Sequence, residues 1–343
     1  MVASLLGCRS APEPVAQPVW WPEGASVAGP GPVGPFSGAR VVETAQRLAA
    51  PGGDAVSGED LARRRQAISE QLGAIGVPNE QWLLASASHG VVATADSPTS
   101  TPLNAVVGVL DGESDDLLLL LAGDEPPDRG GVALEPIERV SGAAALLELA
   151  RVLAARPRPY GVWLGFLDDS RPDAVLDFEA SELLMEELAR RGVLPRVRIV
   201  VLFGSLIDRD LRIDRDLRSH RVHRETFWDS ARSLGLEEVF ADDAAFGSPD
   251  SAHVVWLAGG LRSVVAIVGE PSRGSSPADT DEQATAASIT RLDEFGVVAL
   301  DALARIASRF AGIDGFAKSP LTSERWEDAS PPPEAPHVPA PVQ

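Results

Sequence analysis

The sequence predicts an α/β fold, a three-layer α/β/α sandwich around a central mixed, mostly parallel β-sheet. Short apolar runs of strand length alternate along the chain with longer segments of helical periodicity, which is typical of a sheet covered by helices on both faces. Several of these runs are apolar at every position, as expected for strands that are buried on both sides. A hairpin-like connection between the first two runs adds antiparallel strands to the expected sheet.

The helices are predicted from their start and stop signals. Residues 58–75 give the clearest early signal, because Ser57 and Asp60 form a capping-box pattern and Gly76 ends the periodicity. Ser141 is expected to be the N-cap of another helix, rich in alanine and leucine. Helices are predicted at residues 38–50, 58–75, 141–155, 175–191, 223–234, 251–258 and 280–310.

The strands are predicted from the apolar runs between these helices. They cover residues 103–110, 117–122, 160–167, 196–203 and 263–268. Residues 111–114, Asp-Gly-Glu-Ser, separate the first two runs and predict the hairpin-like connection. Ligands of such sheets bind in the crevice beyond the carboxyl ends of the strands. A functional site is therefore expected in the loops that follow the predicted strands.

Composition divides the chain into three parts. Residues 1–36 are a lipobox-like start and a Pro/Gly-rich tether, residues 37–310 are the folded domain, and residues 311–343 are predicted to be a disordered Pro-rich tail. The formal charge of −20 disfavours nucleic-acid partners, since phosphate backbones are repelled. No apolar run reaches the length of about 18 residues that a transmembrane helix requires.

The only cysteine, Cys8, ends the sequence Leu-Leu-Gly-Cys, which resembles the lipobox of bacterial lipoprotein signals. This interpretation predicts cleavage before Cys8 and a lipid on its sulfur. The protein would then lie on the periplasmic side of the bacterial cell envelope and meet the membrane only through that lipid. The alternative is a cysteine without any modification. Seven residues precede Cys8 and none is basic, so a complete signal peptide requires an earlier translation start.

Acidic side chains follow two of the predicted strands. Asp124 and Glu125 come after the strand at 117–122, and Asp168 and Asp169 come after the strand at 160–167. Carboxylates at strand ends bind hard cations or zinc. In a chain this acidic, the alternative is a set of solvated loops with no site.

Histidine, the usual ligand of catalytic zinc, is scarce. The chain has His89, His220, His223, His253 and His337, and no H-E-x-x-H motif. His220 and His223 lie among arginines, which disfavour a nearby cation. His253 is the best candidate ligand, and the alternative is a histidine at a helix start whose hydrogen bonds are satisfied by its neighbours. No G-x-S-x-G motif indicates a serine nucleophile.

One segment resembles a known family. Residues 138–151, ERVSGAAALLELAR, are similar to the D-x-A-S-G-x-A-x-L-L-E-L-A-R segment of metallopeptidase family 28, which includes zinc aminopeptidases and glutaminyl cyclases. Other segments resemble that family in the same order: residues 104–108, 163–169, 203–211, 251–260 and 278–281. The resemblance spans about residues 36 to 310. It implies a zinc-exopeptidase-like fold, zinc as cofactor and activity on the N-termini of peptides.

The resemblance also implies that the metal site is degenerate. Family positions for metal ligands fall on residues that are not the family's ligands: Gly123, Arg171, Gly204 and Ser275. The general-base glutamate falls on Ser170. Glu125 takes the place of an acidic partner, and Glu138 takes the place of the bridging aspartate. A shift in the alignment brings Asp169 toward a ligand position, and His253 keeps its identity at a family motif.

Zinc catalysis needs about three protein ligands, an open position and a base. Arg171 instead places a permanent positive charge at a ligand position. The leading hypothesis is therefore a domain without catalysis or cofactor that binds or scaffolds a peptide or protein. The alternative is an active, divergent zinc aminopeptidase or glutaminyl-peptide cyclotransferase, whose site would use Glu125, Glu138, Asp169 or Asp173, and His253. Metal-free hydrolysis at Ser170 or Ser205 is a third hypothesis.

Overall fold

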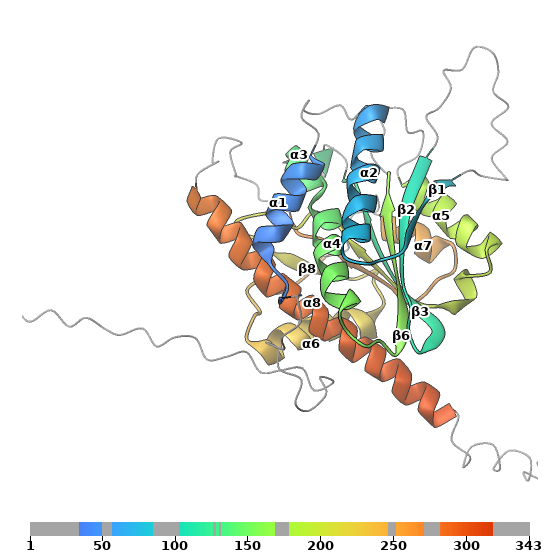
Figure 1. Cartoon of the computed structure of the whole chain (residues 1–343). Coiled ribbons are helices and arrows are strands. Elements are labelled where there is room, and N and C mark those ends of the chain that lie inside the picture. The colour runs from blue at the N-terminus through green and yellow to red at the C-terminus, as the bar shows by residue number, and fades with distance from the viewer. Residues whose placement is uncertain are drawn as a thin grey trace, which may run out of the picture.

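The computed structural model describes residues 34–49, 57–84, 103–125, 128–129, 132–168, 178–245, 252–270 and 282–317. Its main sheet has six strands in the order β1-β2-β6-β3-β7-β10, with helices on both faces (Figure 1). These strands are β1 (Asn79–Leu84), β2 (Leu103–Leu110), β3 (Ser114–Gly123), β6 (Tyr160–Leu167), β7 (Val197–Phe203) and β10 (Val264–Ile267). The predicted α/β sandwich with a mixed, mostly parallel sheet is confirmed.

The helices and short strands complete the layers. The helices are α1 (Gly38–Leu48), α2 (Gly58–Ala74), α3 (Pro136–Arg139), α4 (Ser141–Ala154), α5 (Glu179–Arg190), η1 (Leu194–Arg196), α6 (Arg221–Leu234), α7 (Ala252–Ala258) and α8 (Glu282–Ala317). Two short two-stranded sheets are added by β4 (Asp128–Arg129) with β5 (Val132–Ala133), and by β8 (Ile213–Asp216) with β9 (Phe240–Ala245).

Strand pairing corrects one prediction. β1 and β2 are antiparallel to their neighbours, whereas β6, β3, β7 and β10 run parallel. The predicted hairpin between β2 and β3 is wrong, because β6 lies between these two strands. The connection passes directly over the start of β6: a Cβ built on Gly112 would lie 2.1 Å from the carbonyl carbon of Tyr160. Glycine there lets the two backbones approach.

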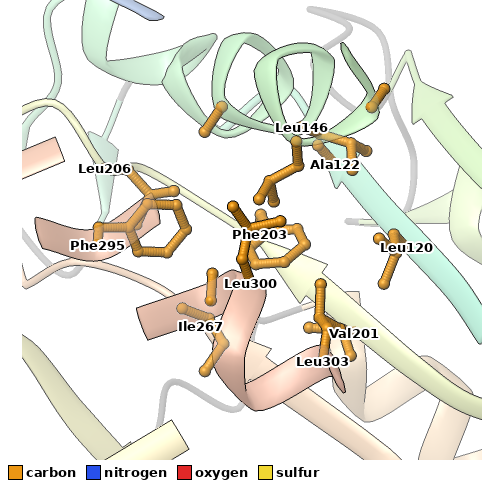
Figure 2. Packing of buried hydrophobic residues seen from close by; sticks show 14 of the residues in the cluster. Leu120, Ala122, Leu146, Val201, Phe203, Leu206, Ile267, Phe295, Leu300 and Leu303 are labelled. Atoms are coloured by element: carbon orange, nitrogen blue, oxygen red, sulfur yellow. The ribbon is translucent and has the colours of Figure 1, made fainter. Parts of the chain in front are cut away.

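The two faces of the sheet bury separate apolar clusters, and β3 supplies both. Leu118, Leu120 and Ala122 face the cluster under α1, α2, α4, α6 and α8. Leu117, Leu119 and Leu121 face the cluster under α5 and α7. Figure 2 shows the first cluster, where Leu146 of α4 and Phe295 of α8 close around Phe203. Both faces of the central strands are therefore fixed by packing.

Helix ends agree with the capping signals in part. Ser57 and Asp60 form the predicted capping box of α2. Ser141 is not an N-cap, because the short helix α3 leads directly into α4 and the cap position is Val140. The last helix continues to Ala317, so residues 311–317 are helical where a disordered tail was predicted. The start of the helix predicted at 175–191 lies partly outside the described residues, and α5 begins at Glu179 after a left-handed Phe178.

The chain enters the fold beside α4 and α8. Phe36 packs edge-on against Phe295, with ring centroids 6.2 Å apart. Arg151, in the last turn of α4, donates hydrogen bonds to the carbonyl oxygens of Gly34 and Pro35. Cys8 and the predicted tether before residue 34 lie outside the described residues. Within the part of the chain described here, no helix has the length and apolar character needed to cross a membrane.

Candidate functional site

Two aspartates stand side by side where neighbouring parallel strands end. Gly123 of β3 pairs in register with Leu167 of β6, and Asp124 and Asp168 are the residues that follow them. Each aspartate is only 5% exposed. This is the predicted edge of the sheet, and two of the acidic residues noted in the sequence meet there.

Consecutive arginines on α2 neutralise these two carboxylates. Arg64 donates a hydrogen bond to Asp124, and Arg65 donates one to Asp168. Arg64 is itself buried, and its Nε also donates to the carbonyl oxygen of Leu48 at 3.0 Å. The charges that follow β3 and β6 are therefore balanced from within the fold, at the place where the resemblance puts a metal.

Burial dominates the electrostatics of both aspartates. Loss of solvent raises the pKa of Asp124, and the charges of Arg64 and Arg139 oppose this increase only in part. Burial also raises the pKa of Asp168 to about 6, although its ion pair with Arg65 acts in the opposite direction. For each carboxylate, the arginine therefore favours the ionised form and burial opposes it.

The raised pKa of Asp168 predicts a pH-dependent stability. The folded chain holds the Asp168 proton up to a pH of about 6, whereas an unfolded aspartate releases it near its ordinary pKa of 3.8. The contribution of Asp168 to the free energy of unfolding is therefore expected to fall as the pH rises through this window. Denaturant unfolding of the wild type and of Asp168→Asn between about pH 4 and 7 measures it. The difference between the two curves should change with pH, while the exposed control Asp229→Asn should follow the wild type at every pH.

Glu125 lies over the end of β7. A Cβ built on Gly204 would lie 2.5 Å from Oε1 of Glu125 and 2.6 Å from Cγ1 of Val268. The absence of a side chain at Gly204 thus makes room for this carboxylate. The backbone of Glu125 is held on both sides by Arg139, whose carbonyl oxygen accepts from the Glu125 N–H at 3.1 Å and whose Nε donates to the Glu125 carbonyl oxygen at 2.9 Å. Two predicted site positions, Glu125 and Gly204, therefore meet at this edge.

The Glu138 side chain caps α3, the helix in which it lies. Its Oε2 accepts a hydrogen bond from the backbone N–H of Glu135 at 2.6 Å, in a capping box at the start of α3. Burial raises the pKa of Glu138, the Glu135 N–H opposes that shift, and the negative charges of Asp208 and Glu135 add to it. The carboxylate at the family's bridging position is thus engaged with backbone.

His253 belongs to a buried contact between α7 and the turn after β8. Its Nε2 lies 3.0 Å from Oδ2 of Asp216, and the histidine is 1% exposed. Ser219 donates to the same carboxylate and accepts from the N–H of Ala266 in β10. Burial alone would raise the pKa of Asp216, but the hydrogen bonds from His253 and Ser219 outweigh it and hold that pKa well below its usual range. This arrangement supports the interpretation of His253 as a structural histidine.

The remaining candidates cannot be placed in this arrangement. The following predicted positions lie outside the described residues: Asp169, Ser170, Arg171, Asp173 and Ser275. In the described ranges, no three histidine, cysteine, aspartate or glutamate side chains form a group able to hold a metal ion. Ser205, the other serine candidate, is buried, and its carbonyl oxygen accepts from the N–H of Gly269 at 2.8 Å.

Several solved structures share the fold of this chain. No known protein-family profile and no curated protein sequence matches the chain. A glutaminyl cyclase from an Acidobacteriales bacterium is similar with a TM-score of 0.62 and 18% identity, over 82% of this chain and 98% of that one. The Porphyromonas gingivalis glutaminyl cyclase gives 0.59 and 16%, over 78% and 98%. The chain has the glutaminyl cyclase fold. A Zn-dependent exopeptidase from Parabacteroides distasonis shares it, with a TM-score of 0.56 and 17% identity over 80% and 99%.

Zinc, on which that exopeptidase depends, does not fit the described residues at these strand ends. Gly123 and Gly204 have no donor atoms in their side chains. The carboxylates of Asp124 and Asp168 are bound to arginines, and that of Glu138 is bound to backbone. A dication would have to displace guanidinium groups that cannot lose their charge. Asp124 and Asp168 are thus used in internal ion pairs, and Glu138 is used as a helix cap.

Arg64 and Arg65 were not predicted as site residues from the sequence. A signal for them exists in the helical spacing, because Arg64 falls between Leu61 and Ile68 on the face of α2 that is buried. An arginine on the apolar stripe of a helix requires a buried acidic partner. The two aspartates at the ends of the buried strands were the candidates for that partner.

Proposed function

We propose that this chain is a non-catalytic binding or scaffolding domain built on the glutaminyl cyclase fold. The observation that carries the proposal is the pair of buried ion pairs, Arg64 with Asp124 and Arg65 with Asp168, at the carboxyl ends of β3 and β6. Carboxylates that follow parallel strands lie at the edge where such a sheet binds its ligands, and their oxygens can hold a metal ion. In this chain they have arginine partners instead.

Electrostatics supports this assignment. Two guanidinium groups already bring two positive charges to the two strand ends, and arginine stays charged at every accessible pH. A metal ion placed beside them would meet repulsion in surroundings where burial weakens solvent screening. Glycine at positions 123 and 204 and the capping role of Glu138 act in the same direction, since each removes a donor from the site.

A binding role is consistent with the acidic side chains near the carboxyl ends of the strands. Glu125 is partly exposed over Gly204, and Asp208 lies close enough to Glu138 to raise the pKa of that carboxyl group. Acidic groups in a crevice favour a cationic partner, and the amino end or a basic side chain of a peptide has this chemistry. The lipobox-like sequence at Cys8 further supports a location on the periplasmic side of the cell envelope.

Metal content and turnover test the proposal. The purified full chain should contain zinc well below one equivalent, measured by mass spectrometry of the metal. It should give no chelator-sensitive turnover of N-terminal glutaminyl peptides or aminoacyl amides. A bacterial glutaminyl cyclase purified in parallel supplies the positive control for both measurements.

The opposite result would establish a divergent zinc enzyme. One equivalent of zinc together with turnover that a chelator abolishes would overturn the proposal. Glu125→Gln and Glu138→Gln would then identify the carboxylates in use, because a ligand or a general base loses its function when its charge is removed. Turnover that persists in chelator would instead point to the third hypothesis, hydrolysis at Ser170 or Ser205.

A further inference from the structure

A second surface stands out by its charge. Between Asp216 and Glu225 the sequence LRSHRVHR contains three arginines, two histidines and no acidic residue, in a chain with a formal charge of −20. Arginines alternate with aspartates over residues 209–224, a pattern that predicts a mutually paired surface. That expectation holds for Arg209, Arg212 and Arg224, which have Asp210, Asp214 and Glu225 as partners. The turn between β8 and α6 differs.

Aliphatic side chains are exposed at this turn. Leu217 is 40% exposed and Val222 is 50% exposed, and they are two of the three large hydrophobic residues that are exposed in the described part of the chain. Arg221 lies beside Val222 and is also exposed. A pair of exposed aliphatic residues beside arginines, within a few positions of each other, differs from the scattered apolar residues of an ordinary surface.

Other elements bring further arginines to the same place. The N–H of His220 donates to the carbonyl oxygen of Val264 at 2.8 Å, which places the exposed Arg262, two residues before Val264, next to the start of α6. Arg309 reaches across from α8, where its Nη1 lies 3.4 Å from Oγ1 of Thr226. The basic patch comprises Leu217, Arg218, Arg221, Val222, Arg262 and Arg309.

The acidic residues beside the turn are engaged with other groups. Asp216 is buried and accepts hydrogen bonds from Ser219, and Glu225 is paired with Arg215 and Arg224. Among the residues that the structure describes, Arg221 and Arg262 form no ion pair. The patch therefore carries a local positive charge while the chain as a whole is strongly negative.

We infer that the basic patch docks onto the surface of an anionic phospholipid membrane. Arginines attract the negative headgroups, and the aliphatic residues beside them enter the boundary between headgroups and acyl chains. A soluble anion would use the arginines alone and would not explain the exposed Leu217 and Val222. This contact is separate from a lipid at Cys8 and does not depend on the proposed function.

The position of the patch also determines how the docked chain would be oriented on the membrane. It lies where α6 and β10 begin, whereas the candidate site follows the carboxyl ends of the parallel strands. In Figure 1, α6 lies at the opposite end of the molecule from α3, which contains Glu138. A chain docked through the patch would therefore present the candidate site away from the membrane and toward partners in the surrounding solution.

Vesicle co-sedimentation tests the inference. The full chain carrying Cys8→Ser, which has no site for a lipid, is mixed at low ionic strength with vesicles of phosphatidylglycerol and phosphatidylcholine, or of phosphatidylcholine alone. We expect binding to the anionic vesicles alone, and weaker binding as salt is added. Each arginine removed should lower the partition coefficient about fivefold, so Arg221→Gln with Arg262→Gln should lower it about 25-fold. The control Arg40→Gln, an exposed position on α1, should leave it unchanged.

Aliphatic variants separate a membrane from other anionic partners. Leu217→Ser with Val222→Ser removes only exposed side chains, and it should weaken vesicle binding while leaving the denaturation midpoint unchanged. Equal binding to neutral and anionic vesicles would overturn the inference, as would equal effects of the Arg221/Arg262 and Arg40 variants. If the aliphatic variant binds like the wild type and a soluble polyanion competes fully, the partner is an acidic polymer or protein and the membrane proposal is wrong.

Discussion

Arg64→Met is expected to lower the free energy of unfolding by about 3–5 kcal/mol, because it leaves a buried carboxylate without its partner. Asp124 is 5% exposed, and burial already raises its pKa against the influence of Arg64. Methionine fills much of the arginine's volume, so the loss reports charge and hydrogen bonding more than a cavity. Equilibrium unfolding in urea at neutral pH measures the change.

Arg63→Met is the matched control, one residue earlier on the same helix. The Arg63 side chain is 54% exposed and pairs with Asp60 at the surface, so its loss should cost less than about 1 kcal/mol. The double variant Arg64→Met with Asp124→Leu removes both charges and should recover most of the stability lost in the single variant. If Arg64→Met and Arg63→Met cost the same, Arg64 is not the counter-ion of Asp124. The ion pair would then give no reason to exclude a metal ion at this position.

The ion pairs supply the positive charge that buried acidic side chains require at the ends of these strands. In an α/β sheet of this kind, acidic side chains after parallel strands are stable only with a positive partner, because burial penalises an uncompensated charge. A metal ion is one such partner, and a guanidinium group from a neighbouring helix is another. With Arg64 and Arg65 in place, the charges of Asp124 and Asp168 are balanced by side chains of the fold itself.

Strongly apolar elements were predictable from local sequence alone. Residues 160–167 are apolar at nearly every position, and β6 has these bounds. Such a run has only one way to bury both faces, at the centre of a sheet between two helical layers. The capping box of α2 was equally local, because Ser57 and Asp60 act within one turn. Polar strands gave no such signal: β1, with the sequence NEQWLL, and β8, with IDRD, were not predicted.

Strand order was beyond the reach of local patterns. The residues between β2 and β3 have the composition of a hairpin turn, yet β6 inserts between these strands. Residues 111–114 contain no signal for the pairing of β6 with β2 and β3, because hydrophobic contacts about fifty residues later in the chain decide that pairing. The same limit applies to the candidate site. Spacing on α2 indicated that Arg64 faces the core, but its partner at the end of β3 is a long-range contact that only the structure identifies.

Gly142→Ala is expected to cost about 3 kcal/mol, the upper end of the usual range for overpacking. A Cβ at this position would lie 2.4 Å from the carbonyl oxygen of Phe203 and 2.5 Å from that of Gly204. Both atoms are backbone at the end of β7, so relief requires α4 and β7 to separate. Denaturant unfolding measures the loss. Gly73→Ala, where no atom lies within 4 Å, serves as the control and should stabilise the chain by about 0.5–1 kcal/mol through helix propensity.

Such a loss of stability would show that Ser141 and Gly142, the Ser-Gly pair of the family-like segment, have a structural role. Ser141 Oγ donates to the carbonyl oxygen of Glu138 at 2.5 Å and accepts from the N–H of Leu206 at 2.7 Å, which joins α3, α4 and the end of β7. Gly142 lets that joint close. Ser141 and Gly142, which hold this joint, match the family-like segment, whereas Gly123 and Gly204 have no donor at positions that the resemblance assigns to metal ligands. A tolerated Gly142→Ala would contradict this division, because the close approach of α4 to β7 would then be dispensable.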